Sequence, residues 1–288
     1  MFVDLPDGRR IEVLVAGPED GMPLVYHYGT PSAAVPHAPM IDAAARRGLR
    51  TVVYSRPGYG ESTAQPGRSV ADVAADTAAV LDALGAGRFV TVGTSGGGPH
   101  ALACAALLPE RCAAAASVAG VAPFGAEGLD WLAGMGRENI EEFGAATEGP
   151  DELTRFLEDQ AKTVATVQAT DIVEAFGDLV SDVDKRALTG DFAEFIAATF
   201  RRAVLHGIEG WRDDDLAFIR DWKFRPGDGA PVAIWQGGQD RMVPYAHGEW
   251  LAEHVPGARV HLLLDEGHLS LLIRVFGDVL DDLLDMAA

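Results

Sequence analysis

The chain has 288 residues, of which 48% are hydrophobic and 23% charged, a composition that allows a large core and excludes extended disorder. Its formal net charge of −20 opposes binding to nucleic acid and to anionic membrane surfaces. The first residues lack the basic start and apolar core of a signal peptide, and no run is as hydrophobic as a membrane span. Cys104 and Cys112 lie in apolar surroundings that favour packed thiols. We therefore expect a cytoplasmic protein without nucleic-acid or membrane partners, and the sequence carries no signal for an oligomeric state.

Short apolar or alternating runs, bounded by glycine, proline or aspartate, predict the strands. They occupy residues 2–5, 10–16, 24–26, 51–54, 89–93, 113–121, 232–235 and 260–264. Helical spacing predicts helices near residues 36–47, 70–84, 101–108 and 271–284, and residues 69–72 read as a capping box. Strands that alternate with helices imply a mainly parallel sheet covered by helices on both faces.

This alternation stops after the strand at 113–121. Residues 125–227 read as several helices without a strand, so we expect a helical cap inserted into a core of residues 1–124 and 228–288. The cap segment contains 22 acidic and 11 basic residues. We expect its acids to lie on solvated helix faces and its aromatic side chains mainly to pack within the cap itself.

Ser95 stands on a turn between the strand at 89–93 and the helix at 101–108. Gly93 and Gly97 flank it two residues away on either side, a spacing that allows a sharp turn with the serine oxygen projecting above the sheet. The helix that follows points free N–H groups toward that oxygen. The turn therefore predicts a nucleophilic serine, and the alternative is a glycine-rich turn used only for close packing.

A serine hydroxyl needs a base to remove its proton and a third group to orient that base. Asp240 and His268 follow the last two predicted strands, at the carboxyl ends where open α/β sheets bind ligands. Of the histidines, only His27 and His268 lie in loops that leave strands. The order Ser95, Asp240, His268 predicts a catalytic triad. The alternatives are simple turn formation at Asp240 and a surface position for His268.

Together these motifs resemble the α/β-hydrolase fold family, in its capped Ser-Asp-His branch, across nearly the whole chain. The resemblance rests on the serine turn at 93–97, the Gly-x-x-Asp-x-x-Val-Pro arrangement at 237–244, the Gly-His pair at 267–268 and the Pro-Gly-x-Gly-x-Ser loop at 57–62. It implies an oxyanion hole formed by the backbone N–H groups of Gly96 and Thr30. Family members often have His-Gly-x-Pro in the second loop, whereas Tyr28 precedes Gly29 here, which leaves the register of this loop open.

The resemblance implies hydrolysis of a small, uncharged ester through an acyl-enzyme on Ser95, while the sequence leaves open an amide or a carbon–carbon bond in place of the ester bond. No cofactor or metal is expected, because the sequence has no Cys/His cluster with metal spacing and no dinucleotide-binding glycine motif after a strand. Serine at this position argues against the epoxide-hydrolase and haloalkane-dehalogenase branches, which form an alkyl ester on a carboxylate.

Two alternatives remain. The first is an aminopeptidase resembling proline iminopeptidases, in which cap acids hold the amino end of the substrate; that branch usually has tryptophan where this chain has Gly96. The second is a non-catalytic ligand-binding protein of the same fold, which would have no need of all three triad residues. An unpartnered cap acid facing the pocket would favour a substrate with an ammonium group, and we expect none.

Overall fold

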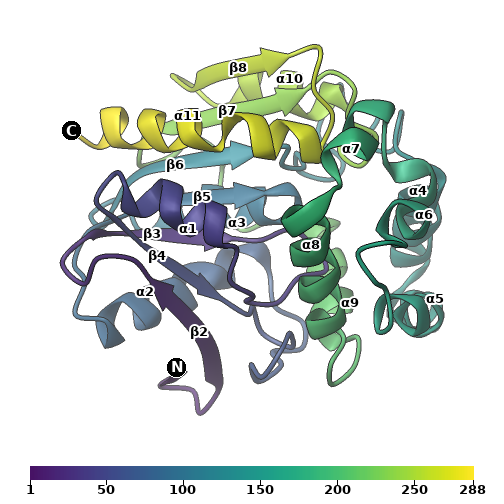
Figure 1. Ribbon diagram of the computed structural model, residues 1–288, viewed down its shortest axis with the longest axis horizontal. Coiled ribbons are helices and arrows are strands. Elements are labelled where there is room, and N and C mark those ends of the chain that lie inside the picture. Colours follow the sequence, from purple (N-terminus) through teal and green to yellow (C-terminus); the bar gives the residue numbers. More distant parts are fainter.

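The computed structural model describes residues 1–288 and is built on one eight-stranded sheet (Figure 1). The strands are β1 (Phe2–Asp4), β2 (Arg10–Ala16), β3 (Met22–His27), β4 (Leu49–Tyr54), β5 (Phe89–Thr94), β6 (Cys112–Val118), β7 (Val232–Gly237) and β8 (Arg259–Leu263). Their order is β1-β2-β4-β3-β5-β6-β7-β8. The β1–β2 and β2–β4 pairs are antiparallel and every other pair is parallel, so the mainly parallel sheet is confirmed.

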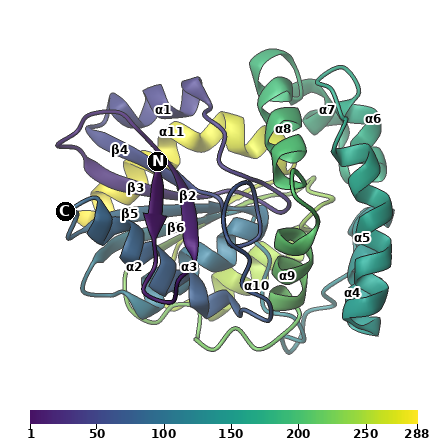
Figure 2. The ribbon, with the colours of Figure 1, turned by 90° about the horizontal axis from the view of Figure 1, so that it is seen from below.

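Helices cover both faces of this sheet. They are α1 (Ala38–Ala45), α2 (Val73–Ala83), α3 (Gly98–Leu107), α10 (Tyr245–His254) and α11 (Leu269–Ala287), with short 3-10 turns η1 (Val70–Asp72) and η2 (Ser95–Gly97). Figure 2 shows α1 and α11 on one face and α2, α3 and α10 on the other. Successive strand side chains point to opposite faces, so Leu24 and Tyr26 join the core under α11 while Val25 joins the core on the α3 side. Both cysteines are free and buried, as expected of packed thiols.

The strand β6 ends earlier than its apolar pattern predicts. The run of small residues continues to Val121, but the strand stops at Val118 because Ala119 has a φ of +50°. Gly120 then lies against α3, where a Cβ atom would stand 3.0 Å from the Cα of Gly98. The run of small residues correctly predicts a buried segment. The point at which the strand ends depends instead on the close approach of the Gly120 and Gly98 backbones.

Six α-helices occupy the cap segment, residues 125–227, between β6 and β7. They are α4 (Arg137–Glu148), α5 (Pro150–Val164), α6 (Ile172–Phe176), α7 (Asp182–Ala187), α8 (Gly190–Ala203) and α9 (Glu209–Phe218), with the short turn η3 (Gly177–Leu179) after α6. The segment contains no strand, as its sequence predicts. Both views place these helices beyond the carboxyl ends of the parallel strands (Figures 1 and 2). None of the helices in the protein combines the length and hydrophobicity that crossing a membrane requires.

Candidate active site

Strand β5 carries Ser95 to the middle of the sheet edge. The strand lies between β3 and β6, and Ser95 follows it with a φ of +54°, a conformation that costs a residue with a side chain about 1–3 kcal/mol. A Cβ atom on Gly93 would lie 2.0 Å from the carbonyl oxygen of Gly97, and one on Gly97 would lie 2.0 Å from that of His27. Both flanking positions therefore require glycine, and they hold the serine at the tip of the predicted sharp turn.

Asp240 and His268 meet beside β7 and β8, as their positions in the sequence predict. The Asp240 Oδ2 atom lies 2.7 Å from His268 Nδ1 and 3.1 Å from Gln236 Nε2. The other oxygen, Oδ1, accepts hydrogen bonds from the backbone N–H groups of Met242 at 2.9 Å and Val243 at 2.8 Å. These four contacts fix the carboxylate, so it can orient the imidazole through Nδ1 and leave Nε2 for another partner.

The pKa of His268 reflects two opposing influences. Burial of the imidazole lowers the pKa, but the negative charge and hydrogen bond of Asp240, with a smaller contribution from Asp184, outweigh it. The pKa of His268 is therefore raised above its ordinary value. A histidine held in this way gains a proton readily during a reaction and returns it afterwards.

Asp184, from the cap helix α7, holds the loop that carries His268. Its side chain is fully buried and accepts hydrogen bonds from the backbone N–H groups of His268 at 3.1 Å, Leu269 at 2.8 Å and Ser270 at 2.9 Å. These are the first N–H groups of α11, which have no acceptor within the helix. Sequence reasoning missed Asp184 because its only local signal is a capping box with Ser181, and the partners that matter lie more than 80 residues away.

The loop after β3 lies beside the serine turn. A Cβ atom on Gly29 would lie 3.2 Å from the Ser95 Cβ atom, and one on Gly96 would lie 2.4 Å from the Thr30 Oγ1 atom. The N–H of Gly96 lies at the start of η2, where the first N–H groups lack helical acceptors. The structure thus brings Gly96 and Thr30 together beside Ser95, and their role as oxyanion-hole donors stays a prediction.

Ser95 lies at the junction of two cavity lobes. The first, of about 640 Å³, is lined mainly by apolar side chains, and we call it the apolar lobe; it includes Tyr26, Tyr28, Phe195, Ile196, His268 and Leu272. The second, of about 980 Å³, lies under α4, α5 and α9, and we call it the acidic lobe; it includes Gly96, Glu138, Glu141, Glu142, Trp211 and Asp215. Thr30, Ser95 and Met242 line both lobes. A substrate that spans both lobes would place its scissile bond at Ser95.

His27, the other candidate base, lines neither lobe. Its ring is buried beneath the sheet edge, with Nε2 3.6 Å from the Cys104 sulfur. Burial holds the pKa of His27 well below its ordinary value, and the nearby positive charge of Arg56 lowers it further. His27 is a neutral core residue, whereas His268 lines the same cavity as Ser95.

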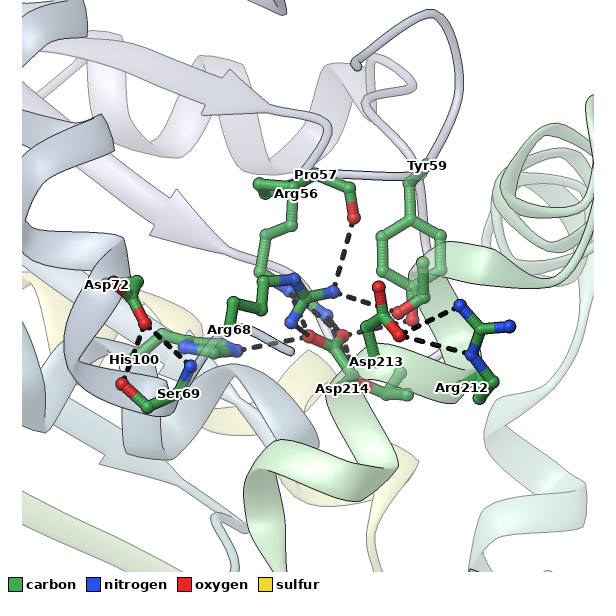
Figure 3. A network of polar contacts seen from close by, with 12 residues as sticks. Arg56, Pro57, Tyr59, Arg68, Ser69, Asp72, His100, Arg212, Asp213 and Asp214 are labelled. Carbon is green, nitrogen blue, oxygen red and sulfur yellow. Dashed lines mark hydrogen bonds and ion pairs between the residues drawn. The ribbon is translucent and has the colours of Figure 1, made fainter. Parts of the chain in front are cut away.

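A buried ionic cluster joins the cap helix α9 to the segment after β4, which carries Arg56 and Arg68 (Figure 3). Asp214, on α9, is fully buried and accepts hydrogen bonds from Arg56 Nη2 at 2.6 Å, Arg68 Nη1 at 2.5 Å and the Thr30 hydroxyl at 2.9 Å. Arg56 also donates to the carbonyl oxygens of Tyr28 at 2.6 Å and Gly29 at 3.0 Å. The loop carbonyls are thereby turned toward Arg56, and the cap residue Asp214 fixes the side chain of Thr30.

Opposite charges keep Asp214 ionised inside the protein. Burial raises its pKa, but Arg56 and Arg68 outweigh that effect and hold the pKa well below its ordinary range. The His100 Nε2 atom lies 3.5 Å from the same carboxylate, and burial lowers the pKa of His100 to about 4, so this ring is neutral near pH 7. The stabilisation from Asp214 is present above the carboxyl pKa of an unfolded chain, about 3.9, and is lost as the pH falls through the folded pKa.

Replacing Asp214 by asparagine should destabilise the protein markedly. The change leaves two buried guanidinium groups without a counter-charge, and we expect the free energy of unfolding to fall by about 3 kcal/mol in urea denaturation at pH 7. Asp213→Asn is the matched control, because Asp213 is its sequence neighbour and pairs only with Arg212, at 3.1 Å. If the free energy of unfolding fell equally in the two variants, Asp214 would not be the carboxylate that stabilises the cluster.

The expectation that the cap acids lie on solvated helix faces is wrong for four aspartates. Asp184, Asp213, Asp214 and Asp215 are all buried. Asp213 and Asp214 are buried against arginines and Asp184 against backbone N–H groups, which offset the cost of removing a carboxylate from water. Asp215 lines the acidic lobe, and neither of its oxygens has a hydrogen-bond partner.

The expectation for the cap aromatics needs a similar correction. Several of these side chains line the cavity, whereas Trp131 packs elsewhere; those on the cavity wall are Phe143, Phe156, Phe176, Phe195, Phe200, Trp211 and Phe218. Their rings serve both as cap core and as cavity wall, because the amphipathic cap helices turn their apolar faces toward the sheet edge.

Known proteins share this architecture. The family model of the alpha/beta hydrolase fold matches residues 22–275. A non-heme chloroperoxidase of Streptomyces lividans is 35% identical over 147 residues, which are 50% of this chain and 53% of that protein. Epoxide hydrolase B of Mycobacterium tuberculosis is 30% identical over 150 residues, which are 50% of this chain and 42% of that protein. The chain spans about half the length of the curated relatives it matches.

Solved structures match over nearly the full length. An enol-lactonase from Burkholderia xenovorans LB400 has a TM-score of 0.66 at 20% identity, covering 99% of this chain and 100% of that one. A structure from work on carboxylesterases of Nitrososphaera gargenis has a TM-score of 0.70 at 18% identity, covering 100% of this chain and 98% of that one. At this level of identity the likeness shows the fold alone. The match of the family model covers most of the sequence, so the chain belongs to the alpha/beta hydrolase fold family.

Proposed function

We propose that the protein is a serine hydrolase that cleaves a small carboxylic ester through an acyl-enzyme on Ser95. The observation that carries the proposal is the position of Ser95 at the junction of two cavity lobes, with His268 on the same cavity and its Nδ1 atom 2.7 Å from Asp240. Acyl transfer by a serine requires a base and a group that orients the base, and His268 with Asp240 can supply both on the cavity that Ser95 lines.

In this mechanism the Ser95 oxygen attacks the ester carbonyl carbon while His268 Nε2 takes the hydroxyl proton. The N–H groups of Gly96 and Thr30 stabilise the negative charge that develops on the carbonyl oxygen. When the intermediate collapses, His268 returns the proton to the departing alcohol, and the acyl group stays on Ser95. A water molecule, deprotonated by His268, then attacks the acyl carbon. The bond between that carbon and the Ser95 oxygen breaks, His268 returns its proton to this oxygen, and the acid leaves.

The substrate preference follows from the apolar lobe. Its walls include Phe195, Ile196 and Leu272, which would leave a charged group without partners. We therefore infer that the part of the ester in this lobe is small and uncharged. Epoxide opening is disfavoured, because an alkyl-enzyme ester forms on a carboxylate and position 95 is serine.

The test is whether different esters pass through one acyl-enzyme. The phenyl and 4-nitrophenyl esters of butyric acid should divide their acyl group between water and added hydroxylamine in the same ratio, because both leave the same butyryl group on Ser95. Product ratios that differ between the two leaving groups would reject a common acyl-enzyme. Failure to turn over either ester or a series of other short esters, with ligands still bound, would favour the non-catalytic alternative.

The pH dependence of turnover should report His268. We expect kcat/KM for 4-nitrophenyl butyrate to rise with pH as His268 loses its proton, with the midpoint above the ordinary histidine value of about 6.5. The midpoint lies above the ordinary value because Asp240 stabilises the protonated ring and raises the pKa of His268. A rate measured from pH 5 to 9 that is flat, or that falls with pH over this range, would contradict His268 as the base.

A second candidate function is cleavage of an ester or amide whose acyl part carries an amine. One observation favours it: Asp215 faces the cavity without a hydrogen-bond partner. The comparison is kcat/KM for a short acyl nitrophenyl ester against the corresponding aminoacyl ester and a prolyl amide. A preference of tenfold or more for the amino-bearing substrates would favour the aminopeptidase over the simple esterase.

A further inference from the structure

One arginine binds three successive residues of the loop after β3. Arg56 follows β4, and its side chain is only 3% exposed. Its Nη1 atom donates to the Tyr28 carbonyl oxygen at 2.6 Å, and Nη2 donates to the Gly29 carbonyl oxygen and the Thr30 hydroxyl oxygen, each at 3.0 Å. The fork of a single planar guanidinium group therefore holds this part of the loop.

These contacts fix the direction of the Thr30 N–H group. The peptide bond between Gly29 and Thr30 is trans, so its carbonyl oxygen and its N–H hydrogen point in opposite directions. Because the Gly29 carbonyl oxygen faces Arg56, the Thr30 N–H points away from Arg56. That N–H donates to no acceptor of the protein, and Thr30 lines both cavity lobes beside Ser95. The N–H is therefore free to bind a substrate oxygen.

The cap supplies the group that holds Arg56 in place. The Asp214 Oδ2 atom accepts hydrogen bonds from Arg56 Nη2 at 2.6 Å and Nε at 3.0 Å (Figure 3). The same oxygen accepts from the Thr30 hydroxyl at 2.9 Å. Two nitrogens fix the plane of the guanidinium, so the docking of α9 sets the position of Arg56 and, through Arg56, that of the loop.

Arg68 shares Asp214 with Arg56 but does not touch the loop. It donates from Nη1 to Asp214 Oδ1 at 2.5 Å. Its Nη2 atom donates to the carbonyl oxygens of Pro57 at 3.2 Å and Gly210 at 2.9 Å. The two arginine side chains are equally buried. They therefore differ in their partners, since only Arg56 contacts residues 28–30.

We propose that Arg56, held by Asp214 of the cap, is a positioning residue for the oxyanion hole. It fixes the peptide group before Thr30 so that the Thr30 N–H faces the oxyanion that forms at Ser95. The inference rests on the proposed function and deepens it, because the cap helix α9 then acts on the rate of the reaction as well as on the shape of the cavity. A donor that is already aimed at the oxyanion needs no reorganisation when the charge develops, and the hydrogen bond from Arg56 polarises the peptide group and strengthens this donor.

The central variant is Arg56→Lys. Lysine keeps a positive charge opposite Asp214, but one ammonium group cannot reproduce the guanidinium fork that holds the carboxylate and both carbonyl oxygens. We expect kcat for 4-nitrophenyl butyrate to fall by at least about tenfold, toward the hundredfold or more that loss of a whole oxyanion-hole donor costs. KM should stay within a few-fold of the wild-type value, since the interaction that is lost acts mainly in the transition state.

Arg68→Lys is the matched control, because it makes the same substitution at the other arginine of the cluster. It should also lower the free energy of unfolding, measured in urea at pH 7, since Arg68 is buried against the same carboxylate. We expect its kcat to stay within a few-fold of the wild-type value. If Arg56 were important only for stability, the two variants would instead lose activity in proportion to their loss of stability.

The affinity for butyl trifluoromethyl ketone gives a second measure. The Ser95 oxygen adds to the carbonyl carbon of this ketone and the hydroxyl proton passes to His268, which leaves an oxyanion in the oxyanion hole. 1-Butanol can enter the same cavity but forms no oxyanion. We expect Arg56→Lys to weaken inhibition by the ketone at least about tenfold, as it weakens transition-state binding, and to leave that by 1-butanol within a few-fold.

Asp214→Asn should act in the same direction, because it removes the charge that holds Arg56. Asp213→Asn is again its control. Thermal unfolding identifies any variant that does not fold, and Asp214→Asn carries the test if Arg56→Lys does not. A folded Asp214→Asn variant with the wild-type affinity for the ketone would show that the cap does not hold the loop through Arg56.

The outcomes separate this inference from the proposed function. If the wild-type protein hydrolyses the ester and folded Arg56→Lys keeps its kcat and its affinity for the ketone, the positioning role is wrong while the esterase proposal stands. Equal losses of kcat in Arg56→Lys and Arg68→Lys would also reject the positioning role, since only Arg56 contacts the loop. A wild-type protein that neither cleaves esters nor binds the ketone at Ser95 would reject the proposed function and the positioning role together.

Discussion

Ser95→Ala should lower kcat for 4-nitrophenyl butyrate by at least about a thousandfold, because losing a serine nucleophile typically costs several powers of ten in rate. The fold should survive the change. Alanine adopts the same φ of +54° at a similar cost, and the neighbouring glycines leave the turn unobstructed. Steady-state kinetics give the rate, and thermal unfolding confirms that the variant is folded.

A folded Ser95→Ala variant that keeps more than a few per cent of the wild-type rate would show that another group attacks the ester. The matched control is Ser32→Ala, since Ser32 also lines the apolar lobe but lies outside the serine turn. This control should stay within a few-fold of the wild-type rate.

Asp240→Asn should reduce kcat by up to about ten-thousandfold, by analogy with the effect of this change in other serine hydrolases. The asparagine oxygen can still accept from the backbone N–H groups of Met242 and Val243, which directs the amide NH₂ toward His268. A donor facing Nδ1 favours the tautomer that has its proton on Nε2, and that tautomer cannot accept the proton of Ser95.

Asp265→Asn is the control for this prediction, because Asp265 is an exposed acid three residues before His268. It should leave the rate close to that of the wild type. A different assignment of the triad would be required if Asp240→Asn were active while His27→Ala and His268→Ala were equally damaging.

The sequence predicts the sheet and the serine turn well because both depend on local patterns. Alternating or continuous apolar runs identify the strands, and the glycines on either side of Ser95 are required by contacts within a few residues or with the adjacent strand. Asp240 and His268 are also recognisable, since each lies in the loop that follows a strand. Their pairing follows from the order of the strands, because β7 and β8 are neighbours.

The roles of the cap acids depend on contacts between distant parts of the chain. Asp214 and Arg56 are 158 residues apart, so no local pattern relates them. The run of three aspartates at 213–215 resembles a solvated helix face, but successive helix residues point about 100° apart and cannot share one face. In the structure Asp213 faces Arg212, Asp214 faces the buried arginines and Asp215 faces the acidic lobe.

Active-site labelling tests the central claim most directly. A fluorophosphonate probe reacts with a serine only when a neighbouring base and an oxyanion hole activate that serine. We predict stoichiometric labelling of the wild-type protein, located by peptide mass on Ser95 and lost in His268→Ala. Labelling of a different residue, or no labelling of a folded protein that hydrolyses esters, would contradict the assignment of Ser95 as the nucleophile.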